Sequence, residues 1–319
     1  MTPHDMLEDA LHSELIYKYS APRLDLLKST LIRFTQPNGL NDPFEARPRL
    51  LMDSLAPEDI ESARAEAKMM GLSPDLPREQ LEALFLRGFP AHRMDERSFP
   101  GLWPCHLPAL REEPFESLGE LDRFRADEAA REFMDAASKE LGILCLTEDG
   151  HSQLMWAHYA CSHSGVLLTF HREHAFFKEG MGLHRVEYAP RRVAVTSKDG
   201  LFRICGVRFE DAVPLPLRAF LRKHPVWSHE VELRMMRALS ESVAQRLDKP
   251  DVYLFPVPPT ALAAIVLGAR ASAEYVAAVR AILSSDGRWS HVRLFEAILD
   301  GQEMALNYEE TEMRRGSSR

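Results

Sequence analysis

Alternating and clustered hydrophobic positions predict strands before and after the region at about 54–139. Short runs of β-branched and aromatic residues between turn residues are typical of strands. The runs that fit lie at 15–19, 31–35, 141–147, 166–170, 183–188, 189–196, 231–236, 263–268 and 292–298. Helical segments are expected after Pro22, over 209–222, and from the cap residue Ser272 to about Leu283. The last of these predicts a strand–helix–strand unit at about 260–300.

The region at about 54–139 has a different pattern. Charged amphipathic segments at 57–70, 79–86 and 122–141 are typical of helices with one solvated face. They interrupt the strands, so we expect a helical insertion here. Nothing in it points to catalysis, and it suits a cap over a site or a surface for a partner protein equally well.

These patterns predict an α+β fold of mixed or antiparallel small sheets flanked by helices. The 319 residues suit one large domain or two small ones. We expect a single domain, 1–319, that contains the insertion.

Composition excludes some classes of protein. The net charge of -9 at pH 7 argues against a protein that coats nucleic acid, although a local basic groove stays open. No run of about twenty apolar residues exists, and the acidic N-terminus lacks a signal core, so we expect a cytoplasmic location without membrane contact. The four cysteines form no C-x-x-C pair, which disfavours a zinc site of the usual spacing.

An aromatic stretch is the first candidate site. Trp156, His158, Tyr159 and His163 fall on a short helix that turns into the strand at 166–170. Helical spacing places Trp156 with Tyr159, and Tyr159 with His163, on shared faces. Gly165 is expected to take the positive φ that ends the helix. Such a rim can bind a flat ligand, and the same rings can equally fill a core; both interpretations stay open.

The second candidate follows Trp227. Glu230, Glu232 and Arg234 alternate at period two, which places them on one face of the strand. Such charges are costly to bury unless they pair or meet a ligand. The alternative is an exposed edge strand in which Glu232 pairs with Arg234.

A polar loop forms the third candidate. Asn41, Asp42 and Glu45 follow the strand at 31–35, and loops held by a sheet often carry binding groups. A tight turn, with Asn41 and Asp42 bonded to their own backbone, explains the same residues.

Several of these motifs resemble, in order, the bacterial family of domains of unknown function numbered 2971. They are Tyr17-Lys-Tyr19, Leu31-Ile-Arg-Phe, Asn41-Asp-Pro-Phe-Glu45, Leu144-Cys-Leu-Thr, Met155-Trp-Ala-His-Tyr-Ala160 with Gly165-Val, Trp227-Ser-His-Glu-Val-Glu-Leu-Arg234 and Ile265-Val-Leu-Gly268. The resemblance covers most of the chain outside 54–139, which is longer than expected of the family. The family implies no activity.

The order of elements is also similar to the ADP-ribosyltransferase fold, whose members bind NAD in a cleft between two small sheets. This resemblance implies NAD as substrate, with Tyr17 and Tyr19 flanking the nicotinamide pocket and Lys18 or Arg234 holding the pyrophosphate. Glu230 or Glu232 would take the place of the catalytic glutamate. The chain lacks a clear H-Y-E or R-S-E triad, so two late glutamates compete for one role.

Three hypotheses follow. The first is an NAD-consuming ADP-ribosyltransferase-like enzyme, a toxin or phage-defence effector with a protein or nucleic-acid acceptor. Its catalytic residues are Glu230 and Glu232, and its nucleotide-binding residues are Tyr17, Lys18, Tyr19, Asn41, Asp42, Glu45, Trp156, His158, Tyr159, His163, Trp227 and Arg234. The second is a non-catalytic module that senses a nucleotide in a defence system. The third is a nuclease with Asp42, Glu45, Glu230 and Glu232 around a divalent ion.

Overall fold

The chain divides into two compact units, which are described separately. The first unit comprises residues 1–43, 138–190 and 223–319, and the second comprises 44–137 and 191–222. The computed structural model describes residues 14–51, 137–196, 217–246 and 251–311, with isolated positions between 60 and 78 and at 131, 134 and 135. The expected helical insertion falls almost wholly in the second unit, and most of it lies outside the described residues.

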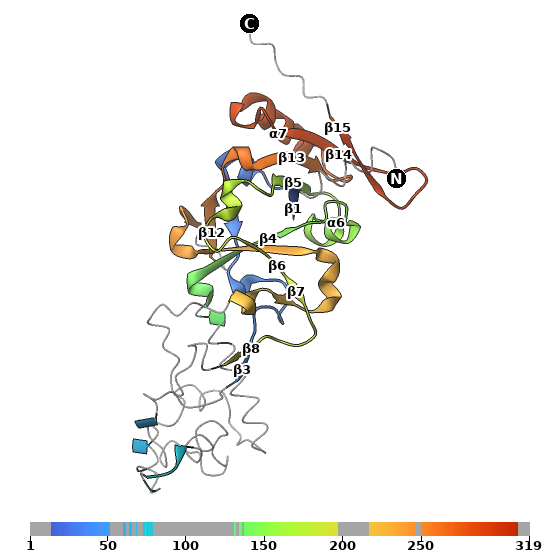
Figure 1. Cartoon of the computed structure of the whole chain (residues 1–319). Coiled ribbons are helices and arrows are strands. Elements are labelled where there is room, and N and C mark those ends of the chain that lie inside the picture. Colours follow the sequence, from blue (N-terminus) through green and yellow to red (C-terminus); the bar gives the residue numbers. More distant parts are fainter. Residues whose placement is uncertain are drawn as a thin grey trace, which may run out of the picture. The chain divides into compact units, whose positions relative to one another are not determined.

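In the described part of the first unit, eight strands form one main sheet (Figure 1). They are β1 (Leu15–Ser20), β4 (Leu141–Thr147), β5 (Val166–His171), β6 (Leu183–Arg185), β10 (Glu232–Ala238), β13 (Leu262–Leu267), β14 (Arg293–Leu299) and β15 (Leu306–Glu310). Their order is β15-β14-β13-β5-β1-β4-β10-β6. Neighbours run antiparallel, apart from β13 and β14, which are parallel across helix α7 (Ala273–Ser285). The fold is therefore α+β, with a larger sheet than the small ones expected.

Strand β1 joins the two halves of the main sheet. It pairs with β5 along its whole length, from Leu15↔His171 to Ser20↔Val166. With β4, the described residues give one register pair, Tyr17↔Thr147. Beyond that pair the Lys18 ammonium donates to the Cys145 carbonyl oxygen at 3.0 Å. The halves of the sheet are thus linked by backbone pairing at one point and by a lysine side chain beside it.

Smaller sheets and short helices complete the described residues. In the first unit β2 (Leu31–Phe34) and β11 (Ala244–Arg246) flank β12 (Val252–Pro256). Strand β7 (Glu187–Tyr188) pairs with β9 (Arg222–Lys223), of which Lys223 belongs to the first unit. In the second unit β3 (Arg49–Leu51) pairs in parallel with β8 (Ala194–Thr196). Besides α7, the helices that lie wholly within the described residues are α2 (Asp25–Ser29), α6 (Gln153–Tyr159) and the 3-10 helices η1 (Pro37–Gly39), η4 (Ala175–Lys178), η6 (Leu217–Phe220), η7 (Pro225–Glu230), η8 (Leu239–Glu241), η9 (Pro259–Ala261) and η10 (Gly287–Trp289).

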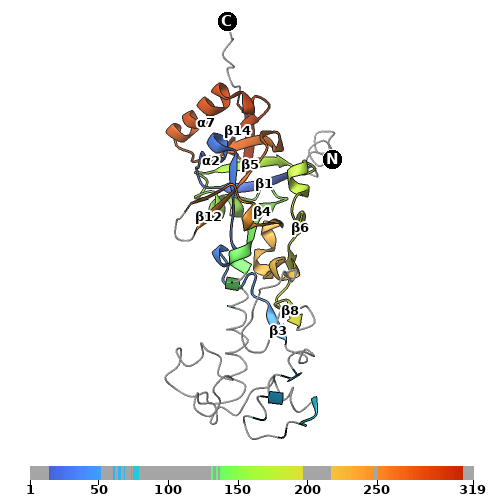
Figure 2. The same cartoon turned by 90° about the vertical axis from the view of Figure 1, so that its left-hand side faces the viewer.

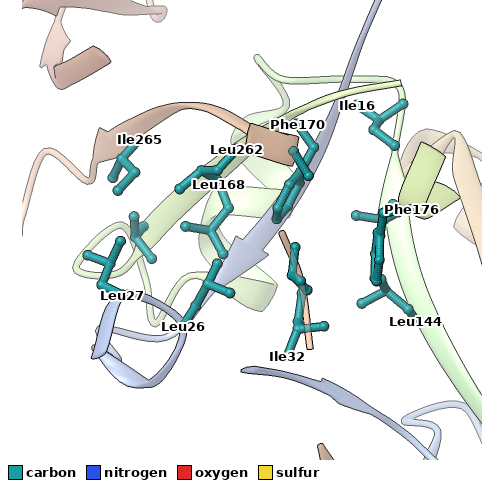
Figure 3. Packing of buried hydrophobic residues seen from close by; sticks show 14 of the residues in the cluster. Ile16, Leu26, Leu27, Ile32, Leu144, Leu168, Phe170, Phe176, Leu262 and Ile265 are labelled. Atoms are coloured by element: carbon teal, nitrogen blue, oxygen red, sulfur yellow. The ribbon is translucent and has the colours of Figure 1, made fainter. Parts of the chain in front are cut away.

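The main core lies on the face of the sheet that α2, α7 and the β2–β12 sheet cover. Figure 3 shows Leu26 and Leu27 of α2 and Ile32 of β2 close to Leu168 and Phe170 of the sheet. Helices α2 and α7 lie side by side (Figure 2), where the Tyr275 hydroxyl donates to the Arg23 carbonyl oxygen at 3.1 Å. Alternation along each strand sends every second side chain to the opposite face.

Helix α6 covers that opposite face. The Ser152 side chain caps it by accepting the Met155 N–H at 3.3 Å. Met155, Trp156 and Ala160 then pack on an apolar cluster that includes Tyr17, Tyr19, Leu167, Val266 and Ala297. The C-terminal residue of the helix, Tyr159, lies at the border of this cluster.

The turn after α6 differs from its prediction. Gly165 does not have a positive φ; instead Cys161, Ser162 and His163 do, at 47°, 54° and 69°. A side chain at Gly165 would place its Cβ 2.1 Å from the Ser20 carbonyl oxygen. Glycine is therefore needed here because the backbone of β1 approaches closely, whereas the left-handed turn is made by the three preceding residues.

Two further expectations have a partial outcome. Of the helix expected over 209–222, the described part is the short helix η6 and the first residue of β9, and 209–216 lie outside the described residues.

Among the residues that the structure describes, no helix has the length and apolarity needed to cross a membrane.

Candidate functional site

A cluster of buried charges lies at the start of β10. Lys223, Glu230, Glu232 and Arg234 are 4%, 2%, 6% and 0% exposed. Charged side chains are almost never buried this fully unless they pair. Glu232 and Arg234 alternate with Leu233 and Met235, which belong to the main core, so the charges lie on the face that α6 covers. The expected alternative, an exposed edge-strand face, is wrong, because β10 lies between β4 and β6.

Glu232 is fully engaged by Arg234. The Arg234 Nε donates to Oε1 at 2.8 Å and a terminal nitrogen donates to Oε2 at 2.9 Å. Burial raises the pKa of Glu232, but the Arg234 guanidinium more than offsets this and brings it to about 2. Burial and then the neighbouring Glu232 carboxylate raise the pKa of the Cys145 thiol well above its usual range. This half of the cluster is a bidentate ion pair beside a neutral thiol.

Glu230 lies between a cation and a tyrosine. The Lys223 ammonium donates to its Oε2 at 2.5 Å, and the Tyr159 hydroxyl donates to its Oε1. Burial, followed by the hydrogen bond to Glu230, raises the pKa of Tyr159 above its usual range, so this hydroxyl keeps its proton. The Asn41 side-chain amide donates to the Tyr159 oxygen at 2.9 Å. Because Asn41 is exposed, hydrogen bonds lead from the surface to a buried carboxylate.

The backbone around the two glutamates is fixed by hydroxyl groups. The Thr147 hydroxyl donates to the Glu230 carbonyl oxygen at 2.6 Å, and the Glu232 N–H donates to the Tyr188 hydroxyl oxygen at 2.8 Å. Burial raises the pKa of Tyr188 to about 12. Both carboxylates are therefore carried by backbone that neighbouring strands hold in place.

Val231, between the glutamates, has a left-handed backbone with φ 42° and ψ 50°. A β-branched residue is rarely found there, and such strain is of order 1–3 kcal/mol. The prediction that Glu230 shares one strand face with Glu232 and Arg234 is wrong for this reason: Glu230 ends η7, and β10 begins at Glu232. Strained backbone that its surroundings maintain is frequent at functional sites.

The Trp227 ring borders the cluster of buried charges. The Lys223 ammonium lies 5.0 Å from the centre of its ring, within cation–π range. The ring is half-buried and lies 6.1 Å from that of His229. Val226, the preceding residue in the chain, and Val231, between the two glutamates, expose apolar side chains.

Of the aromatic stretch, Trp156 packs in the core. Trp156 is fully buried, lies edge-on to Tyr19 at 5.3 Å, and donates from Nε1 to the Tyr308 hydroxyl at 2.8 Å. His163 stacks on Trp156 at 6.2 Å rather than sharing a helical face with Tyr159. A ligand-binding role for Trp156 and His163 stays a prediction.

The first strand contributes to the same packing. Tyr17 and Tyr19 are buried, burial raises the pKa of Tyr17 to about 12, and the Tyr19 hydroxyl donates to the Asp149 carbonyl oxygen at 3.2 Å. Lys18 points elsewhere, to Cys145, and burial lowers its pKa. A role for these residues around a nicotinamide ring likewise stays a prediction.

The structure brings Tyr159 and Asn41 to the charge cluster. His158 is exposed on α6, with its ring 6.4 Å from that of Tyr159. Asp42 is buried in the first unit, and Glu45 is buried in the second. Within the described ranges, no group of three or more His, Cys, Asp or Glu side chains is placed to hold a metal ion.

Sequence reasoning missed Lys223, Thr147, Tyr188 and Cys145. Lys223 precedes Glu230 by seven residues, so its role depends on η7 folding back. A lysine immediately before the His224-Pro225 turn is a weak signal that only a search for counter-charges to the glutamates would have found.

Comparison of the chain with protein-family models, with curated proteins and with solved structures finds no match in any of the three. The functional argument therefore rests on the chemistry of the charge cluster.

Proposed function

We propose that the chain is an ADP-ribosyltransferase-like enzyme that cleaves the bond between ribose and nicotinamide in NAD, releases nicotinamide and transfers the ADP-ribosyl group. One observation carries the proposal. The buried Glu230 carboxylate is held between Lys223 and Tyr159, and hydrogen bonds connect it to the exposed Asn41. Transfer to a protein or nucleic acid, or cleavage of NAD without such an acceptor, would suit a toxin or phage-defence effector.

The reaction needs a carboxylate at the ribose. Cleavage of this bond passes through an oxocarbenium-like state, as glycoside cleavage does. A pre-organised negative group stabilises the developing positive charge most strongly where water is excluded. Glu230 meets this requirement, being 2% exposed.

Of the two competing glutamates, the chemistry favours Glu230. Both carboxylates have both oxygens engaged, but Glu232 is held by two hydrogen bonds from the buried Arg234 guanidinium. One oxygen of Glu230 instead accepts from the half-buried Tyr159 hydroxyl, a neutral group that a substrate hydroxyl can replace. Arg234 is itself fully buried, which favours a role in holding Glu232 over one at the pyrophosphate. Glu232 then acts as a positioning residue, since its Oε2 also lies 3.4 Å from the Lys223 ammonium.

Two aromatic side chains suit the nicotinamide ring. Trp227 and Tyr159 are half-buried beside the cluster, so each combines a fixed position with an accessible part. Aromatic rings stack favourably on flat ligands. Tyr159 also keeps its proton, so a ribose hydroxyl can replace it at Glu230 without a change of charge.

The test measures nicotinamide release by mass spectrometry from the purified protein, NAD and a bacterial lysate, without added metal. Glu230→Gln keeps the shape of the side chain and removes its charge. We expect it to lower the release rate by at least about 100-fold, as loss of an electrostatic stabiliser does. Glu173→Gln is the matched control, because Glu173 is an exposed surface carboxylate paired with Lys178.

Equal release by wild type and Glu230→Gln would overturn the proposal. Binding of NAD without release by the wild type would favour the non-catalytic sensor module. Activity on nucleic acid that requires magnesium, with no release of nicotinamide, would favour the nuclease.

A further inference from the structure

The Lys223 ammonium lies in a cradle of two carboxylates and one aromatic ring. Glu230 Oε2 is 2.5 Å from it, Glu232 Oε2 is 3.4 Å from it, and the centre of the Trp227 ring is 5.0 Å away. Carboxylates and the face of a tryptophan are the groups that proteins use to bind organic cations. Here the cation is part of the chain.

The walls of the cradle are anchored independently of Lys223. Thr147 and Tyr188 hold the backbone of Glu230 and Glu232. The Glu230 side chain is also held by Tyr159, and the Glu232 side chain by Arg234. The carboxylates therefore keep their places when the ammonium moves.

Lys223 is the member of the cluster that can move. Its side chain is a flexible four-carbon stem that ends in a point charge. The residue ends the two-residue strand β9 and lies next to the turn at His224. Displacement of the ammonium requires this stem to rotate.

We propose that this cradle binds a flat organic cation, the pyridinium ring of a nicotinamide nucleotide, and that Lys223 occupies its place in the unliganded chain. The inference rests on the proposed function, because the same Glu230 carboxylate faces the substrate. It adds that the positive charge of the ring is what the site selects.

Charge balance supports a cation. With Lys223 withdrawn, Glu232 keeps its pairing with Arg234, whereas Glu230 is left with the neutral Tyr159 hydroxyl. A monocation restores a positive charge beside Glu230, whereas a neutral ring leaves this buried carboxylate without its counter-charge.

The test compares 1-methylnicotinamide, a cation, with nicotinamide, its neutral counterpart. Calorimetric titration is made on wild type and on Lys223→Met, which removes the internal cation. We expect Lys223→Met to bind 1-methylnicotinamide at least ten-fold more tightly than wild type does, and at least ten-fold more tightly than it binds nicotinamide. The double variant K223M/W227L should lose most of this gain. Equal affinity of folded Lys223→Met for the two probes, or no binding of either, would overturn the inference.

A second measurement uses the wild type and so does not depend on the folding of a variant. Acylation of Lys223 by an amine-reactive reagent is followed by peptide mass spectrometry, with and without millimolar 1-methylnicotinamide. Withdrawal of the ammonium should raise the labelling rate with the cation and not with nicotinamide. An unchanged or lower rate with the cation contradicts the displacement of Lys223.

The two proposals fail separately. 1-Methylnicotinamide carries no ribose, so its binding does not require turnover. Nicotinamide release from NAD by a protein that shows no preference for the cation would remove this inference and leave the enzyme. Selective binding without release would remove the enzyme and leave the cation site.

Discussion

At the scale of single residues, Arg234 and Glu232 form a buried pair whose members depend on each other. We expect Arg234→Met to lower the free energy of unfolding by about 3–5 kcal/mol, because it leaves the Glu232 charge buried without its bidentate partner. Adding Glu232→Gln should recover more than half of this loss, since the orphaned charge is then removed. Urea unfolding of the three proteins measures both effects.

An exposed ion pair is the control for that experiment. Arg293 and Glu310 are 60% and 49% exposed at the side chain, and such pairs contribute about 0–1 kcal/mol. Arg293→Met should therefore change the free energy of unfolding by less than about 1 kcal/mol. An equally small effect of Arg234→Met would show that the buried pair does not hold the fold.

The pKa of Glu232 predicts how stability depends on pH. Its pKa is lowered from 4.5 to about 2 in the folded chain, so its contribution is present above about pH 4.5 and is lost as the pH falls toward 2. One pKa unit corresponds to about 1.4 kcal/mol, so the contribution is on the order of 3 kcal/mol. Urea unfolding from pH 6 to 2.5 should show a steeper fall for wild type than for the R234M/E232Q variant. Parallel curves would contradict the shift.

At the scale of elements, the turn between α6 and β5 depends on a close backbone contact. A Cβ at Gly165 would lie 2.1 Å from the Ser20 carbonyl oxygen, and neither backbone can yield without disturbing the pairing of β1 with β5. We expect Gly165→Ala to lower the free energy of unfolding by at least about 2 kcal/mol. Thermal and urea unfolding measure the change.

Gly287 gives the matched control, since a Cβ there meets nothing within 4 Å and its φ is not positive. Gly287→Ala should change stability by less than about 0.5 kcal/mol, as surface substitutions usually do. Similar losses in the two variants would mean that glycine flexibility, rather than space, matters at Gly165.

The local hydrophobic pattern was enough to place strands such as β4 and β13, because both are apolar runs that are buried along most of their length. It failed at Val231, whose left-handed backbone separates Glu230 from the strand although both glutamates are buried. A β-branched residue carries no signal for that conformation. The sequence therefore placed Glu232 and Arg234 on one face of the strand correctly, and was wrong about the backbone that carries Glu230.

At the scale of the whole molecule, strand order was beyond the reach of local patterns. β1 lies between β5 and β4, which are more than a hundred residues further along the chain. Lys223 likewise gains its role from tertiary contacts with Glu230 and Glu232. Such neighbours arise from long-range pairing, and the hydrophobic period of a single segment does not reveal its partners.

The second unit, residues 44–137 and 191–222, interrupts the sequence of the first unit twice. Hydrogen bonds within the first unit join residues near each interruption. Near the first interruption, the Asn38 N–H donates to the Ser138 hydroxyl at 3.0 Å. At the second, the Ala189 N–H donates to the Lys223 carbonyl oxygen at 3.0 Å. Because both contacts lie within the first unit, short flexible linkers can replace 44–137 and 191–222.

We expect this shortened chain to fold and to unfold in one cooperative transition, because the main sheet and its core belong to the first unit. Asn41, Tyr159, Lys223 and Glu230 also lie there, so nicotinamide release, if catalysed by the full chain, should persist. Circular dichroism during heating measures the first outcome and mass spectrometry the second. A chain that also lacks α7 (Ala273–Ser285) is the control and should not fold, since Val279 and Leu283 fill the core. A shortened chain without a cooperative transition would show that the first unit needs the second to fold.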